Sequence, residues 1–84
     1  MDEKVFKEAF ECLQEGKKVV FKDRNGRLPS IMLKMVFCPV GKGAYLLSYI
    51  YGDRGGIVGN ASIQNVVEVV RKVSKIENPK YYCM

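Results

Sequence analysis

Three turn signals divide the middle of the chain into short apolar runs, and this division restricts the fold more than any other feature. The turns cover residues 23–26, 39–43 and 52–56, and they are rich in glycine, proline and aspartate. These residues favour tight turns. The runs between them carry β-branched and aromatic residues and are short for helices. The pattern therefore predicts an antiparallel meander of short strands.

Residues 2–15 predict an amphipathic helix before the first strand. The apolar residues recur at helical spacing along one side: Val5, Phe6, Ala9, Phe10 and Leu13. Gly16 stands where a left-handed residue would end this helix.

The segment 62–74 is ambiguous between helix and strand. Its valines have a high strand propensity, but at 100° per residue its apolar side chains fall on one half of a helical wheel. We give periodicity the greater weight and predict a helix. The predicted fold is α+β, a small antiparallel meander of three to four strands with an N-terminal and a C-terminal helix. If 62–74 were a strand, the fold would be a small five-stranded, partly closed barrel preceded by a helix.

The chain of 84 residues predicts a single domain over 1–84, with a loose tail over 77–84. A domain of this size has a thin core, and self-association is a common way to bury more apolar surface. We therefore expect a homo-oligomer. The start of the chain does not resemble a signal peptide, and its apolar runs are short for a membrane span. We expect a cytoplasmic protein that does not bind a membrane.

The cysteine pattern favours the same compartment. Cys12 and Cys38 fall in apolar stretches and are predicted to be small core residues, and Cys83 is predicted to be a free thiol. The chain has no histidine and no closely spaced cysteine pair, so we expect neither a metal site nor another cofactor.

Two of the turns are related in sequence, as Asp23-Arg24-Asn25-Gly26 and Asp53-Arg54-Gly55-Gly56. In a meander, the turns that follow the first and third strands lie at the same end of the sheet. Arg24, Arg27 and Arg54 should therefore gather at one edge. The arginine fork suits phosphate and carboxylate, and the backbone N–H groups of Gly55 and Gly56 are open to an anion. Such turns also form without a ligand, since aspartate bonds its own backbone.

Three tyrosines of the third strand form a second candidate site. Tyr45, Tyr49 and Tyr51 alternate along the strand and so share one face. If the helices cover the other face, these rings are free to form an interface or to stack on bases. Burial in the core is the interpretation that we rank first, ahead of dimerisation and of base stacking.

The opening Phe6-Lys-Glu-Ala-Phe-Glu-Cys-Leu-Gln-Glu-Gly16-Lys-Lys-Val19 resembles the start of the Thoeris anti-defence proteins of phages. These are small α+β oligomers that sequester cyclic nucleotide signals without chemistry. The resemblance implies a viral protein acting in the host cytoplasm. The family carries a tryptophan after the Lys-Lys-Val strand, and this chain has no tryptophan, so no site residue is transferred.

The net charge of +5 favours an anionic partner. We therefore predict a non-enzymatic protein that binds a nucleotide signal or nucleic acid. The alternative is a protein-interaction module, or an inhibitor that docks on a larger enzyme through the aromatic sheet face. We predict no catalytic residue, because the chain has no histidine and its serines have no evident activating partner.

Overall fold

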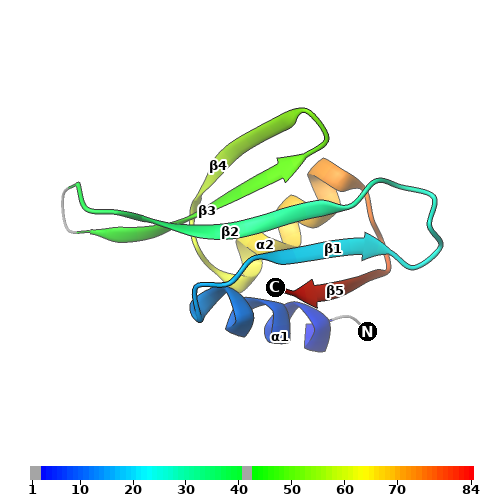
Figure 1. Ribbon diagram of the computed structural model, residues 1–84, viewed down its shortest axis with the longest axis horizontal. Helices are drawn as coiled ribbons and strands as arrows, with labels where there is room; N and C mark the ends of the chain where they lie inside the picture. The colour runs from blue at the N-terminus through cyan, green and yellow to red at the C-terminus, as the bar shows by residue number, and fades with distance from the viewer. Residues whose placement is uncertain (1–2, 41–42) are drawn as a thin grey trace.

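The computed structural model describes residues 3–40 and 43–84. Figure 1 shows the helical segments packed against a sheet, which has five strands. The elements are α1 (Glu3–Gln14), β1 (Val19–Asp23), β2 (Ile31–Cys38), β3 (Ala44–Tyr51), β4 (Arg54–Asn60), α2 (Ile63–Val69), the π-helical turn η1 (Val70–Ser74) and β5 (Pro79–Cys83). The predicted α+β class is confirmed.

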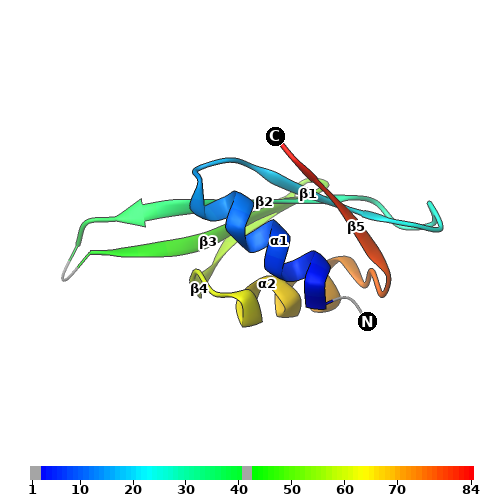
Figure 2. The ribbon, with the colours of Figure 1, turned by 90° about the horizontal axis from the view of Figure 1, so that it is seen from below.

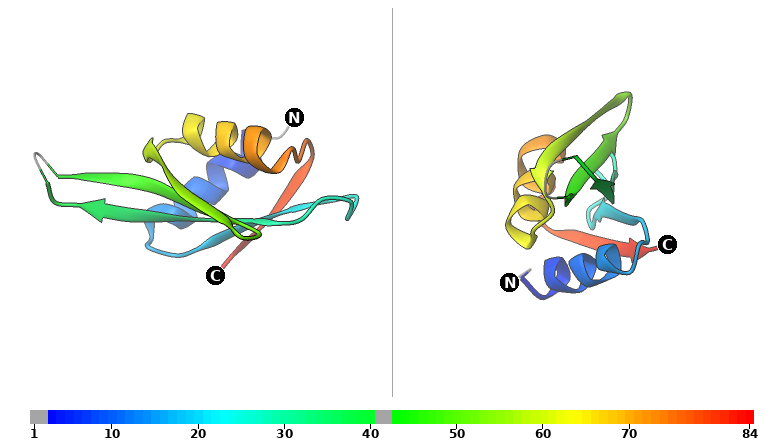
Figure 3. Two further views of the ribbon diagram at one scale, coloured as in Figure 1. Left: turned by 90° about the horizontal axis from the view of Figure 1, so that it is seen from above. Right: turned by 90° about the vertical axis from the view of Figure 1, so that its left-hand side faces the viewer.

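The sheet is antiparallel throughout and has the order β4-β3-β2-β1-β5. The first four strands form the predicted meander, and β5 returns to the other side of β1. The sheet does not close, so the barrel alternative is wrong. Both helices lie against one face of the sheet and leave the other face uncovered (Figures 2 and 3).

Helix α1 forms because its apolar residues fall on one side. Phe6, Ala9 and Leu13 are buried at spacings of three and four. Its end is set by Gly16, whose φ of 84° is left-handed and whose N–H donates to the Leu13 carbonyl at 3.0 Å. Burial of each large apolar side chain contributes about 1.5–3 kcal/mol, so this side holds α1 on the sheet.

The core lies between the helices and the sheet. Its members are almost completely buried and come from every layer: Phe6, Ala9, Cys12, Leu13, Val19, Phe21, Ile31, Leu33, Leu47, Val66, Val69, Val70 and Ile76. The rings of Phe6 and Phe21, with centroids 5.5 Å apart, join α1 to β1.

The segment 62–74 is helical, as its periodicity predicted. The Ser62 hydroxyl accepts a hydrogen bond from the Asn65 N–H at 3.1 Å and caps α2. The last turn is π-helical and ends at Lys75, whose φ of 63° is left-handed. Within that turn the buried Ser74 hydroxyl donates to the Val70 carbonyl.

The tail is not loose, and this prediction was wrong. Strand β5 pairs with the full length of β1, from Val19↔Cys83 to Asp23↔Pro79. The Tyr81 hydroxyl also donates to Glu8 of α1 at 3.0 Å, and this bond is the main cause that raises the pKa of Tyr81, with burial adding to it. The tail is ordered because it pairs with β1, a strand from the other end of the chain.

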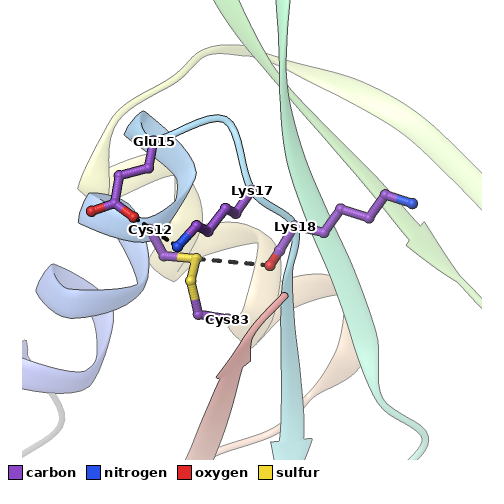
Figure 4. Close-up of polar contacts among 5 residues, drawn as sticks. All are labelled: Cys12, Glu15, Lys17, Lys18 and Cys83. Carbon is purple, nitrogen blue, oxygen red and sulfur yellow. Dashed lines mark hydrogen bonds and ion pairs between the residues drawn. A yellow bond between two sulfur atoms is a disulfide. The ribbon is translucent and has the colours of Figure 1, made fainter.

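The prediction for the cysteines also needs correction. Cys12 and Cys83 form a disulfide, with Cα atoms 6.1 Å apart, that joins α1 to β5 (Figure 4). Cys12 is buried as predicted, but Cys83 is not a free thiol, whereas Cys38 is free. Disulfides persist mainly in oxidising compartments, so the cysteines no longer support a reducing cytoplasm.

Candidate anion-binding face

The predicted arginine edge is only partly assembled. Arg24 and Arg27 lie in the β1–β2 turn and Arg54 begins β4. The two turns lie at the same end of the sheet but diverge from each other (Figures 1 and 3). Arg27 lines a hollow of about 370 Å³ with Lys75, and Arg54 is not among its lining residues. The structure therefore groups Arg27 with the end of η1 rather than with Arg54.

The β1–β2 turn already holds an anion of its own, the carboxylate of Asp23. It accepts hydrogen bonds from the backbone N–H groups of Asn25 (3.2 Å), Arg27 (3.0 Å) and Leu28 (3.2 Å). Burial acts to raise the pKa of Asp23, but these bonds and the nearby Arg27 charge together hold that pKa below its ordinary value. A ligand at this turn would have to use the arginine side chains, because these backbone donors are occupied.

Gly55 and Gly56 lie inside β4, opposite Ile50 and Tyr49 of β3. A Cβ atom at Gly55 would lie 3.2 Å from the Tyr49 carbonyl oxygen, and one at Gly56 would lie 3.3 Å from the Tyr49 ring. Both glycines therefore have a packing role against β3. Their predicted role in anion binding stays a prediction.

The three tyrosines lie on the face that the helices cover. Tyr49 and Tyr51 pack against the core, and Tyr49 stands opposite the buried Leu33. Tyr45 lies near the end of the β2–β3 hairpin and is 57% exposed. The uncovered face of the sheet is therefore not formed by these tyrosines. Tyr49 and Tyr51 pack against the core, as the first-ranked interpretation expects, and Tyr45 is exposed.

The uncovered face, called the open face below, consists of the side chains that alternate with the buried ones. They come from all five strands: Val20 and Lys22, then Met32, Lys34 and Val36, then Leu46, Ser48 and Ile50, then Ile57, and finally Lys80 and Tyr82.

Lys18 extends this set. Its backbone exchanges two hydrogen bonds with Met84, at 3.3 and 2.8 Å, which continue the β1–β5 ladder. Alternation along β1 then puts Lys18 on the open face. In Figure 4 its side chain points away from the disulfide, while Lys17 reaches back to Glu15 at 3.2 Å. We call Lys18, Lys22, Lys34 and Lys80 the lysine group.

Two members of the lysine group flank an exposed aromatic ring. Tyr82 is 42% exposed. The Nζ atoms of Lys22 and Lys80 lie 5.3 and 5.8 Å from the centre of its ring, within cation–π range. Lys22 and Lys80 also stand directly opposite each other on β1 and β5. Like charges in such a pair destabilise a sheet, and a bound anion would remove this repulsion.

The charge of the molecule is divided between its faces. Within residues 3–40 and 43–84, the strand register places no aspartate or glutamate on the open face. Four glutamates instead lie on or next to α1: Glu3, Glu8, Glu11 and Glu15. All the charged side chains that the described strands place on the open face are thus basic. The sequence reasoning missed it because Lys80 and Tyr82 belong to β5, although the alternation in Lys80-Tyr81-Tyr82 was a signal for that strand.

Scans against protein-family models, curated proteins and solved structures found no match to this chain. Among the described residues, none of the helices is long and apolar enough to span a membrane. The same part of the chain contains no group of three or more side chains of the His, Cys, Asp or Glu type placed to hold a metal ion.

Proposed function

We propose that this protein binds an anionic polymer, single-stranded nucleic acid, on the open face and performs no chemistry on it. The observation that carries the proposal is the lysine group, with Lys22 and Lys80 beside Tyr82, on a face where the described strand residues include no acidic side chain. Proteins that bind single strands combine a positive surface that follows the backbone with aromatic rings on which bases stack.

The dimensions of the face support this ligand. Lys18 and Lys22 lie four residues apart on β1, which corresponds to about 13 Å, and Lys80 is on the adjacent strand about 4.8 Å away. A row of positive charges of this length can follow the phosphates of a short single strand. Arg24 and Arg27 follow the Lys22 end of β1, in the turn where the Arg24 N–H bonds Asn78 just before β5, so they lie next to one end of this surface.

A protein partner is a second candidate, favoured by a different part of the open face. Val36, Ile50 and Ile57 are exposed on β2, β3 and β4. Apolar side chains of this kind mark protein interfaces when they are contiguous. Salt distinguishes the candidates, because phosphate contacts weaken steeply with ionic strength and apolar contacts do not.

The direct test is binding of a short fluorescent oligonucleotide, measured by anisotropy. Lys22→Gln with Lys80→Gln should weaken binding and reduce the slope of log affinity against log salt by about 1.4, since each phosphate contact contributes about 0.7. Lys7→Gln with Lys72→Gln removes the same charge from exposed helical positions. This control pair should have a much smaller effect on the affinity and on the salt slope. Equal effects of the two pairs would reject the site.

Competition separates the possible sources of phosphate. A cyclic nucleotide is the ligand that the resemblance to the phage sponges implies. If the cyclic nucleotide displaces the oligonucleotide at a lower concentration than a mononucleotide does, we would conclude that the open face binds a nucleotide signal rather than nucleic acid.

A further inference from the structure

The β2–β3 hairpin extends beyond the rest of the sheet as a two-stranded arm. Strand β1 pairs with β2 only at residues 31–33, and β4 pairs with β3 only from Leu46 onward. Of the outer pairs, Val36↔Leu46 has a third strand on one side, through Leu46↔Asn60. In the described residues, Phe37↔Tyr45 and Cys38↔Ala44 are flanked by no third strand. Figure 1 shows the arm projecting along the 41 Å axis of the molecule. A hairpin without further packing is at best marginally stable in water.

The arm exposes apolar side chains that would be covered in a stable structure. Phe37 and Tyr45 are 54% and 57% exposed, and Val40 is 81% exposed. The two rings stand opposite each other, with centroids 5.2 Å apart. Gly43 allows this packing, because a Cβ atom there would come within 3.3 Å of the Phe37 ring. The arm thus presents a preformed aromatic knob.

A hollow of about 480 Å³ lies at the root of the arm. Its walls come from the end of α1, the root of the arm and the residue after β4: Phe10, Leu13, Gln14, Glu15, Gly16, Met35, Tyr45 and Ala61. Met35, Phe37 and Tyr45 share one side of the hairpin by alternation and pairing. The knob and the hollow therefore lie on the same side of one chain.

We infer that this surface joins two copies of the chain, with the arms antiparallel about a twofold axis and the Phe37 ring of each copy in the hollow of the other. A knob and a hollow side by side are self-complementary, which is what a twofold interface requires. The exposed parts of Phe37 and Tyr45 supply about 100 Å² each. With Val40 and the hollow walls, the two reciprocal contacts bury roughly 900 Å², the size of a weak interface that forms reversibly with concentration.

The charge distribution favours a second copy in this arrangement. The lysine group lies on the open face, on the opposite side of the sheet from Phe37 and Tyr45. Two copies joined through the arms keep these like charges apart and leave both basic faces accessible.

The test is the mass of the full chain, with its disulfide intact, by sedimentation equilibrium over rising concentration and without nucleic acid. The wild type should dimerise, and Phe37→Asp should weaken self-association by roughly thirtyfold, as expected for a central aromatic side chain. Ile57→Asp is the matched control, because Ile57 is an exposed apolar residue of the open face, and it should dimerise like the wild type.

Tyr45→Ser provides a second, milder variant, and circular dichroism checks that each variant is folded. A wild type that stays monomeric at every concentration, or a folded Phe37→Asp variant that still dimerises, would overturn the inference. Dimers that Ile57→Asp disrupts and Phe37→Asp does not would move the interface to the open face. Because no nucleic acid is present, these results are independent of the proposed binding function.

Discussion

The disulfide between Cys12 and Cys83 should supply a large part of the stability of this small protein. It joins residues 71 positions apart, so it closes nearly the whole chain into a loop. In the chain-entropy description, closing a loop of this length removes roughly 15 cal/mol/K from the unfolded state, or about 4.4 kcal/mol at 25 °C. A domain of 84 residues has a total stability of about 4–13 kcal/mol. We therefore expect Cys83→Ser to cost a third or more of the free energy of unfolding.

Urea unfolding followed by circular dichroism measures this cost. Cys83→Ser is the better substitution because Cys83 is exposed, so the serine hydroxyl stays in water. Cys38→Ser is the matched control, since Cys38 is free, and it should change stability by less than about 1 kcal/mol. The reduced wild type should behave like Cys83→Ser, with the β5 amides losing protection from hydrogen exchange first. Equal stabilities of oxidised protein, reduced protein and Cys83→Ser would refute the reasoning.

Three further predictions concern local features. Ser62→Ala removes the hydroxyl that bonds the Asn65 N–H and should cost about 1 kcal/mol in urea unfolding; an unchanged midpoint would contradict the cap. Lys75→Gly relieves a left-handed φ of 63° and should raise the melting temperature through a gain of about 1 kcal/mol, whereas a lower melting temperature would show that the lysine side chain has another role. The lowered pKa of Asp23 means that its contribution to stability is fully present above its unfolded pKa near 3.8 and is lost as pH falls through the lower folded pKa; Asp23→Asn should flatten this part of the pH–stability curve, and identical curves would refute the assignment.

Local patterns were sufficient to predict the helices and the meander. The stripe of apolar residues in α1 and the turn residues around β1, β2 and β3 act over a few positions, so a single sequence reveals them. The segment 62–74 was decided correctly because the burial of Val66, Val69 and Val70 on one side outweighs the strand propensity of valine.

The features that depend on distant parts of the chain could not be predicted in the same way. Strand β5 pairs with β1 across some 60 residues of intervening sequence, and the disulfide depends on that pairing. The lysine group could not be predicted for the same reason, because it combines residues of β1, β2 and β5 and so depends on that pairing. The topology argument placed Arg24 and Arg54 at the correct end of the sheet, but the twist of neighbouring strands separates turns that a flat meander would bring together.

The central claim, that the open face binds single-stranded nucleic acid, is tested most directly by titrating ¹⁵N-labelled protein with a short oligonucleotide and following the amide shifts. We expect the largest changes at Lys18–Lys22, Lys34 and Lys80–Tyr82, with smaller changes at Arg24 and Arg27. Added salt should reverse these changes. Changes concentrated on α1 and α2, or no change at any oligonucleotide concentration in low salt, would contradict the claim.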